Sequence, residues 1–208
     1  MKLTKEQIAY IDNYLKFLNI KSADIRIEIL DHLASEIESE DHCEIGKYIK
    51  SKNSFIREFS KKRENSIHWS YQKQLWLKYF GFFHKLKIAP ITLFSIGTFY
   101  VSLNYFNNKT ILGLSIILVA IVIFYGLIVN LINTKKIKAL VSFKYLGNVL
   151  SIPQLFICTL PIVKDYIIVN PILITIYVSL ALGLSVAAVI LIKEKKNLIL
   201  KRFEFLNN

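Results

Sequence analysis

The side chains best suited to hold a metal ion lie in one short acidic segment. They are Asp31, His32, Asp41, His42, Cys43 and Glu44. A zinc site needs several ligands at short, characteristic spacings, such as paired CxxC units. His32 lies well upstream of His42, and the three adjacent side chains at 41–43 diverge on a helix or in a turn. We therefore expect no metal ion. His32 is expected to border a helical core, and a pH-sensitive role for either histidine stays open.

Nucleophilic catalysis has no better support. The chain has no GxSxG elbow, no P-loop and no GxGxxG sequence. Cys158 lies in an apolar run, which favours a small buried side chain over a reactive thiol. Cys43 lies in a polar segment, so a disulfide between the two is not expected and a reducing cytoplasm is the simpler setting. We expect neither an enzyme nor a cofactor.

Charge divides the chain into two regions. Residues 1–44 carry ten of the 15 acidic side chains but only five of the 27 basic ones. Many of the remaining basic residues lie at the ends of long apolar runs, where anionic lipid headgroups are found. The net charge of +12 therefore favours membrane lipid over nucleic acid as a partner. An acidic soluble region and a membrane region are predicted.

Four runs without a charged side chain are long enough to cross a bilayer as helices. A hydrocarbon core about 30 Å thick needs roughly 20 apolar residues. The runs are residues 88–108, 110–134, 145–163 and 166–192. Pro153 and Pro161 interrupt the third, so we expect that helix to be kinked and packed inside the bundle. The predicted fold is all-α, with a small cytoplasmic helical domain and a four-helix transmembrane bundle over residues 88–192.

Basic residues that flank these runs predict their orientation. One group precedes the first run, one lies between the second and the third, and one follows the fourth. The groups are Lys73, Lys78, Lys85 and Lys87, then Lys135, Lys136, Lys138 and Lys144, then Lys193, Lys195, Lys196, Lys201 and Arg202. With four spans, all three groups share one side, which places both termini in the cytoplasm of a bacterial inner membrane. No ionisable side chain lies deep within a run, which argues against a pump or a proton-coupled carrier.

Small side chains recur along the fourth run. Ser179, Gly183 and Ala187 follow one another at intervals of four. This spacing lets helix backbones approach closely in a membrane. Packing within the bundle is the simpler interpretation, and a homo-oligomer that uses the same face stays open.

Residues 1–60 are predicted to form the acidic cytoplasmic domain. Thr4 and Gln7 have the spacing of a capping box, which indicates a helix start. Two apolar stripes then recur at helical intervals. They are Ile8, Ile11, Leu15 and Leu18, and then Ile25, Ile29, Leu33 and Ile37. Because two short amphipathic helices bury little surface, we expect a third helix around residues 45–59.

The opening of the chain resembles the N-terminal helical domain of bacterial HAAS-type membrane signalling proteins. The similar block is LTKEQIAYIDNYLKFLNIKSADIRIEILDHLASEIE. The resemblance rests on an amphipathic helix with Tyr14 and Leu15, a short turn, and the segment from Ile25 to Leu33. The four following runs are similar to the family's usual layout, although the glycine and proline turns that usually bracket the third helix are lacking. The resemblance implies a membrane-anchored regulatory module without catalytic residues, often paired with a PadR-like transcription regulator.

Residues 61–87 are predicted to form a basic juxtamembrane helix that lies in the membrane interface. On a helical wheel, one face is aromatic and lysines lie opposite. The aromatic face consists of Trp69, Trp76, Tyr79, Phe80 and Phe83. Such a helix either relays the state of the membrane to the head or anchors the head passively, and the passive anchor is the simpler interpretation. Residues 193–208 are predicted to form a basic cytoplasmic tail.

The leading functional prediction is a non-catalytic membrane regulatory or signalling protein whose head binds a cytoplasmic protein. The face predicted to bind that partner carries Glu28, Asp31, His32 and Glu36. The main alternative is a small accessory or permease-like subunit of a membrane transport complex. A third hypothesis is a carrier of a neutral or lipidic solute, which needs a polar cavity. The residues considered for that cavity are Asn104, Asn130, Asn148, Gln154 and Asn170.

Overall fold

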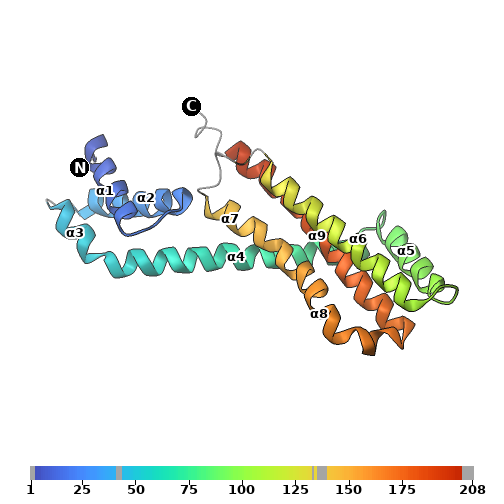
Figure 1. The fold of residues 1–208 in the computed structure, drawn as a ribbon. Coiled ribbons are helices and arrows are strands. Elements are labelled where there is room, and N and C mark those ends of the chain that lie inside the picture. The colour runs from blue at the N-terminus through green and yellow to red at the C-terminus, as the bar shows by residue number, and fades with distance from the viewer. Residues whose placement is uncertain (1–2, 41–43, 133, 135–139, 203–208) are drawn as a thin grey trace. The chain divides into compact units, whose positions relative to one another are not determined.

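The computed structural model of this 208-residue chain describes residues 3–40, 44–132, 134 and 140–202. Within these ranges the chain is helical apart from turns and short connections, and it contains no strand (Figure 1). The chain divides into two compact units. One comprises residues 1–69 and 135–145, and the other comprises residues 70–134 and 146–208. We call the first the head unit and the second the apolar unit.

The head unit begins with a capped helix. Its helices are α1 (Lys5–Phe17), α2 (Ala23–Glu40), α3 (Ile45–Ser51), the first part of α4 (Asn53–His84) and the start of α7 (Val141–Gly147). The Thr4 hydroxyl accepts the backbone N–H of Gln7 (3.3 Å), and the Gln7 side chain accepts that of Thr4 (2.8 Å). The predicted capping box is confirmed. The single helix predicted around residues 45–59 is instead divided at Lys52 into α3 and α4.

Asn19 makes the turn between α1 and α2. Its φ of 66° lies in the left-handed region, which asparagine tolerates better than most side chains. The N–H of Ile20 donates to the carbonyl of Leu15 (3.2 Å), and the N–H of Asn19 donates to that of Lys16 (2.9 Å). These two bonds close the end of α1 in a Schellman arrangement. The turn thereby brings Ile20 into the core.

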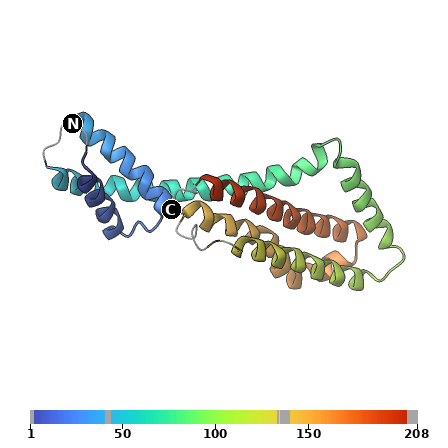
Figure 2. The same ribbon diagram turned by 90° about the horizontal axis from the view of Figure 1, so that it is seen from above.

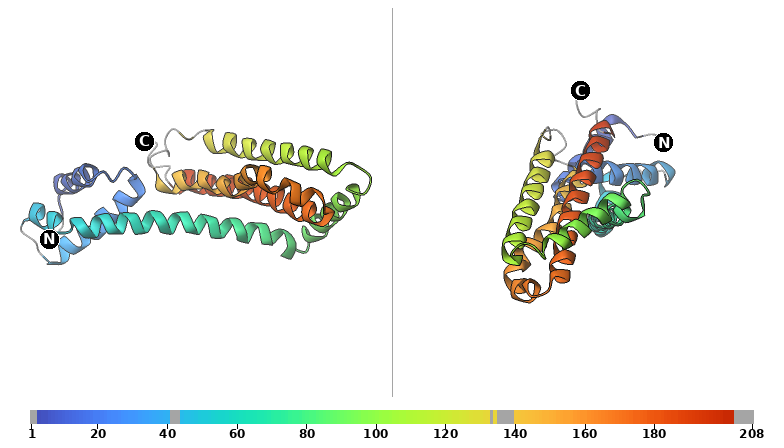
Figure 3. Two further views of the ribbon diagram at one scale, coloured as in Figure 1. Left: turned by 60° about the horizontal axis from the view of Figure 1, so that its bottom comes forward. Right: turned by 90° about the vertical axis from the view of Figure 1, so that its right-hand side faces the viewer.

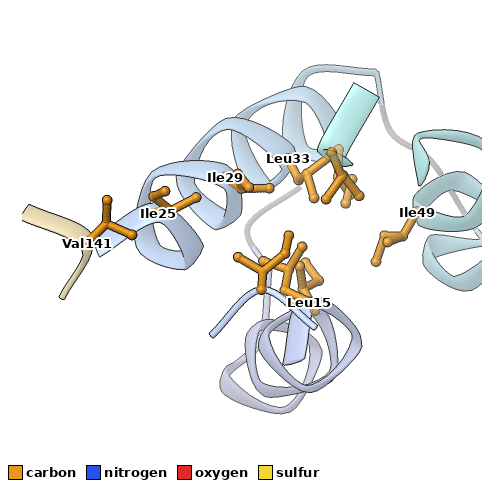
Figure 4. Close-up of a cluster of buried hydrophobic side chains, with 10 residues drawn as sticks. Leu15, Ile25, Ile29, Leu33, Ile49 and Val141 are labelled. Carbon is orange, nitrogen blue, oxygen red and sulfur yellow. The ribbon is translucent and has the colours of Figure 1, made fainter. Parts of the chain in front are cut away.

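The core of the head unit combines apolar faces from all of these helices (Figure 4). Its buried residues are Ile11, Leu15, Ile20, Ile25, Ile29, Leu33, Ile37, Ile49, Ile56 and Val141. The predicted stripe on α2 is confirmed in full. The stripe on α1 is narrower than predicted, because Ile8 is 38% exposed. Val141 comes from the connection between the second and third predicted spans, so a distant segment completes the core.

Three helical stretches among the described residues are long and apolar enough to cross a membrane. They are α6 (Asn108–Leu131), the run Val141–Ile168 and the run Pro171–Lys201. The second run comprises α7, the 3₁₀ turn η1 (Asn148–Leu150) and α8 (Ser151–Ile168), and the third belongs to α9 (Pro171–Arg202). These helices indicate a membrane protein.

The first predicted span is shorter than expected. Helix α5 covers Ala89–Ser102, which is 14 residues. At about 1.5 Å per residue it is roughly 21 Å long, less than a hydrocarbon core of about 30 Å. Pro90 lies in its first turn, where a missing N–H costs little. The Asn107 side chain then accepts the N–H of Lys109 (2.9 Å) and starts α6. The prediction of one uninterrupted helix over residues 88–108 is therefore wrong, and the four-helix bundle is not confirmed.

Helix α9, rather than the third predicted span, is the central helix of the apolar unit. It packs against α5, α6 and α8 (Figures 2 and 3). Small buried side chains on α9 permit this close packing, namely Ala181, Ser185, Ala187 and Ala188. One face of α8 is exposed, with Leu155 58% and Ile162 74% exposed, while Pro153 and Ile167 are buried. The 3₁₀ turn η1 ends three residues before Pro153, a residue that cannot donate to the carbonyl of Val149. Pro161 lies inside α8, which continues past it to Ile168.

Side-chain hydrogen bonds show which helix ends lie together. Asn108 at the start of α6 donates to the carbonyl of Ile168 at the end of α8 (3.1 Å). Lys196 of α9 donates to the carbonyls of Val129 (2.6 Å) and Ile132 at the end of α6. A helix end leaves such carbonyls without partners, so Lys196 caps α6. The long helices therefore alternate in direction. We call the end that holds Lys196 the lysine-rich end.

The chain also passes from one end of the apolar unit to the other before α6. At the lysine-rich end, Lys78 of α4 pairs with Glu194 of α9 (2.5 Å), and Gln72 donates to the carbonyl of Asn148 (3.3 Å). At the opposite end, Leu103 follows α5 in a buried cluster. Its other members are Leu112, Ile167, Ile174 and Val178. Two helices, the end of α4 and then α5, make this passage.

Candidate functional site

The contact between Asp24 and the start of α7 joins segments that are distant in the sequence. Asp24 lies in the first turn of α2. Its carboxylate accepts the backbone N–H groups of Val141 (3.0 Å) and Ser142 (3.1 Å) and the hydroxyl of Ser142 (2.9 Å). The first N–H groups of a helix have no intrahelical partners, and the positive end of the helix dipole attracts a negative charge. Asp24 therefore caps α7 from another helix.

Two residues of α4 hold the same segment. The Tyr145 hydroxyl donates to the carboxylate of Glu64 (3.0 Å), and the ring of His68 lies 5.4 Å from the ring of Tyr145. Glu64 and His68 are four residues apart on a helix, so they share one face. The side chain of Val141 is meanwhile buried in the core of the head unit. Polar and apolar contacts together position the first turn of α7.

Helix α7 opens the apolar run that ends at Ile168. The residues that Asp24 caps are thus the first residues of a helical run long enough to cross a membrane. Any change in the head that withdraws the carboxylate leaves the first N–H groups of this run without that acceptor. Hydrogen bonds from one helix of the head unit thus hold the start of this run.

Two of the four residues predicted to bind a partner are engaged within the head. Glu28 of α2 pairs with Arg63 of α4 (2.8 Å). Glu36 accepts the hydroxyl of Tyr48 and pairs with Lys52 (2.9 Å). The sequence predicted the charge of this face but not that Lys52, between α3 and α4, and Arg63 of α4 supply its counter-charges. Two carboxylates of the predicted acidic face thus already have basic partners within the chain.

The other two residues predicted to bind a partner, His32 and Asp31, differ in their surroundings. The ring of His32 lies 5.4 Å from that of Phe55 and 6.3 Å from that of Phe59, both of which pack against the core. His32 thus borders the helical core, as predicted. Asp31 is exposed on α2. The remaining metal candidates at residues 41–43 lie outside the described residues.

The pairing of Glu36 predicts a pH-dependent stability. The hydrogen bond from Tyr48, followed by that from Lys52, lowers the pKa of the Glu36 carboxyl below its ordinary value of 4.5. Such a carboxyl stabilises the fold above its unfolded pKa, and this contribution is lost as the pH falls through the folded pKa. We expect Glu36→Gln to lower the melting midpoint by roughly 2–4 °C at neutral pH. The difference from the wild type should shrink as the pH falls from neutrality through the folded pKa of Glu36. Circular dichroism melting of the purified chain over a series of pH values tests this, and a difference that does not change with pH would contradict it.

The predicted interface aromatics form a series of ring contacts along α4 but differ in exposure. Trp76 stacks on Phe80 (6.0 Å), and Tyr79 meets Trp76, Phe80 and Phe83 edge to face. Trp69, Trp76 and Phe80 are exposed, whereas Phe83 is half-buried and Tyr79 is buried. The exposed rings are free to meet a membrane interface. Tyr79 serves packing within the apolar unit.

Tyr79 lies against Gly183, one of the predicted helix-packing residues. A Cβ atom at Gly183 would lie 2.5 Å from Cε2 of Tyr79, so the ring fills the space that glycine leaves. Ala187 is fully buried and Ser179 is half-buried on the same helix. Two sets of residues that the sequence suggested separately, the aromatic face and the small-residue stripe, meet at this contact.

The residues considered for a solute path lie at different ends of the apolar unit. The Asn170 side chain accepts the N–H of Ile172 (2.9 Å) and caps the start of α9. Asn148 lies at the lysine-rich end, where its carbonyl accepts from Gln72. Asn148 and Asn170 therefore do not share one polar site. Cys158, predicted to be buried, is exposed on one face of α8.

Sequence reasoning missed the contacts of Asp24, Tyr145 and Lys196. Asp24 and Val141 are 117 residues apart, and no local pattern connects them. The one available signal in the sequence was Asp24 itself, an acidic residue in the first turn of the predicted second helix. Comparisons with protein-family models, curated proteins and solved structures found no match.

Proposed function

We propose that this chain is a non-catalytic membrane regulatory protein. Its helical head binds a soluble partner, and the bound state is passed to the membrane through α7. The observation that carries the proposal is the contact of Asp24 with Val141 and Ser142. Through this contact, the first turn of the run Val141–Ile168, which is long enough to cross a membrane, belongs to the head unit. Regulation of this kind needs no reacting group, because a partner that binds one arrangement of the contact more tightly shifts the population toward it.

The apolar unit lies in a bacterial inner membrane in this proposal, with its lysine-rich end in the cytoplasm. The three long apolar helices and the positive-inside pattern support this placement. The end of α4 and helix α5 together form a fourth, composite crossing. An even number of crossings keeps both termini in the cytoplasm. Labelling of a tag at either terminus by a membrane-impermeant reagent, in intact cells, would overturn this topology.

The partner surface is centred on Asp31 and His32. Asp31 is exposed, whereas Glu28 and Glu36 already have basic partners within the head. The resemblance of the opening block to HAAS-type domains supports a cytoplasmic protein as the partner, with a PadR-like regulator as the first candidate. The exposed carboxylate of Asp31 suits a basic surface on that protein.

A photo-crosslinking residue at position 31 of the full chain tests the proposal. The full chain is required because Val141 belongs to the core of the head unit, which residues 1–60 alone would lack. We expect position 31 to capture one soluble protein in cells. The matched control is position 28, which should give mainly intramolecular products because Glu28 pairs with Arg63. Capture of membrane subunits alone from position 31 would overturn the proposal in favour of a transport accessory role.

A further inference from the structure

We infer that a groove between α4, α5 and α9 binds an anionic phospholipid from the cytoplasmic leaflet. The inference depends on the proposed membrane placement but not on the partner of the head. Two cavities of about 460 Å³ and 400 Å³ lie along these helices. Each is within the range of about 300–1,000 Å³ that small-molecule sites occupy. Phe82 and Ile88 line both cavities, so the two are parts of one groove.

The part of the groove at the lysine-rich end is positively charged. Lys78, Lys85 and Lys195 line it together with Glu194. Glu194 pairs with Lys78 (2.5 Å). Among the described residues, no carboxylate forms an ion pair with Lys85 or Lys195. Two ammonium groups are therefore available to a phosphate group at the position where lipid headgroups lie.

The other part of the groove is apolar. Its lining includes Phe82, Phe83, Phe99, Val178, Leu182 and Val186. On α9, the segment from Val178 to Val186 lies eight to sixteen residues before Glu194, or roughly 12–24 Å deeper at about 1.5 Å per residue. The groove thus changes from charged to apolar with depth, as a phospholipid does from its headgroup to its acyl chain.

Only an anionic amphiphile uses both parts. Free phosphate would leave the apolar part unused, and a lipid without net charge would leave Lys85 and Lys195 without a counter-charge. The break between α4 and α5 shapes the groove, because α4 ends at His84 and α5 begins at Ala89. Gly81 lines the charged part, and the space beside it is open. A Cβ there would meet only Cε of Lys85, at 4.0 Å.

Thermal melting of the full chain, delipidated in a mild detergent, tests the inference. The two tryptophans of the chain, Trp69 and Trp76, report unfolding by fluorescence. We expect phosphatidylglycerol to raise the midpoint, and phosphatidylcholine and inorganic phosphate to leave it within about 1 °C of the lipid-free value. An equal response to both lipids would mean ordinary solvation by the bilayer. A response to phosphate alone would mean a surface anion site. Either outcome, or no response to any of the three, overturns the inference.

Variants locate the effect in the groove. We expect Lys85→Gln combined with Lys195→Gln to weaken binding of phosphatidylglycerol. About ten times more of this lipid should be needed for the same rise in the melting midpoint. Lys61→Gln combined with Lys62→Gln removes the same charge from exposed positions elsewhere on α4 and should leave the response unchanged. Gly81→Leu fills the charged part without changing charge and should also weaken it. The inference would be overturned if the Lys61 and Lys62 double variant lost as much of the response to phosphatidylglycerol as the Lys85 and Lys195 double variant. A wrong membrane placement shows itself separately, as recovery of the chain in the soluble fraction without detergent.

Discussion

We expect the replacement of Gly183 with alanine to lower the melting midpoint of the purified chain by about 2–12 °C. The added Cβ would lie 2.5 Å from Cε2 and 3.0 Å from Cδ2 of Tyr79, whereas carbon atoms in contact are about 3.5–4.0 Å apart. The ring cannot easily withdraw, because Tyr79 is buried and meets Trp76, Phe80 and Phe83. Overpacking of this kind costs about 1–3 kcal/mol, and about 2–4 °C accompanies each kcal/mol in a chain of this size.

Two other glycines provide matched controls. A Cβ at Gly97 of α5 or at Gly113 of α6 would meet nothing within 4 Å. Alanine is the better helix former by about 0.5–1 kcal/mol, so both substitutions should leave the midpoint unchanged or raise it. Gly183→Ala should also cost less in a Tyr79→Ala background, because the clashing ring is gone. If Gly183→Ala is tolerated like Gly97→Ala, the ring does not lie on Gly183. If it alters only the oligomeric state, this face is an interface between copies of the chain.

The parts of the fold that follow local rules could be predicted from the sequence. The capping box at Thr4 and the apolar stripe on α2 each depend on residues within a few positions of one another, so periodicity and spacing were enough. The long apolar runs of α6 and α9 were equally clear, since length and composition decide them. The clearest local error was the first span, because α5 ends at Ser102 inside a run that contains no charge.

The candidate site could not be predicted, because its contacts are non-local. Lys196 looked like part of a basic tail, but its ammonium group caps α6, which ends more than sixty residues earlier in the chain. The acidic face of α2 looked like a partner surface, but Glu28 and Glu36 bind Arg63 and Lys52 of the same head. Charge patterning gives the sign of a surface, whereas tertiary packing decides which charges remain free.

Replacing Asp24 with alanine should release the first turn of α7 without unfolding the head. The substitution removes the acceptor of three hydrogen bonds from Val141 and Ser142, and loss of a helix cap costs about 1–2 kcal/mol. Amide hydrogens at residues 141–145 should therefore exchange about tenfold faster in the full chain, since about 1.4 kcal/mol corresponds to a factor of ten. Hydrogen exchange followed by mass spectrometry measures this directly.

Controls separate the loss of the cap from a general loss of stability. Asp31→Ala removes the same charge from an exposed position on the same helix and should leave exchange at residues 141–145 unchanged. Asp24→Asn keeps an acceptor oxygen but removes the charge that the helix dipole favours, so its effect should be intermediate. Ser142→Ala removes only the hydroxyl bond and should have the smallest effect. Unchanged protection of residues 141–145 in Asp24→Ala would show that the carboxylate does not hold α7. The regulatory proposal would then lose its structural basis, because no other polar contact of α2 with this segment is found among the described residues.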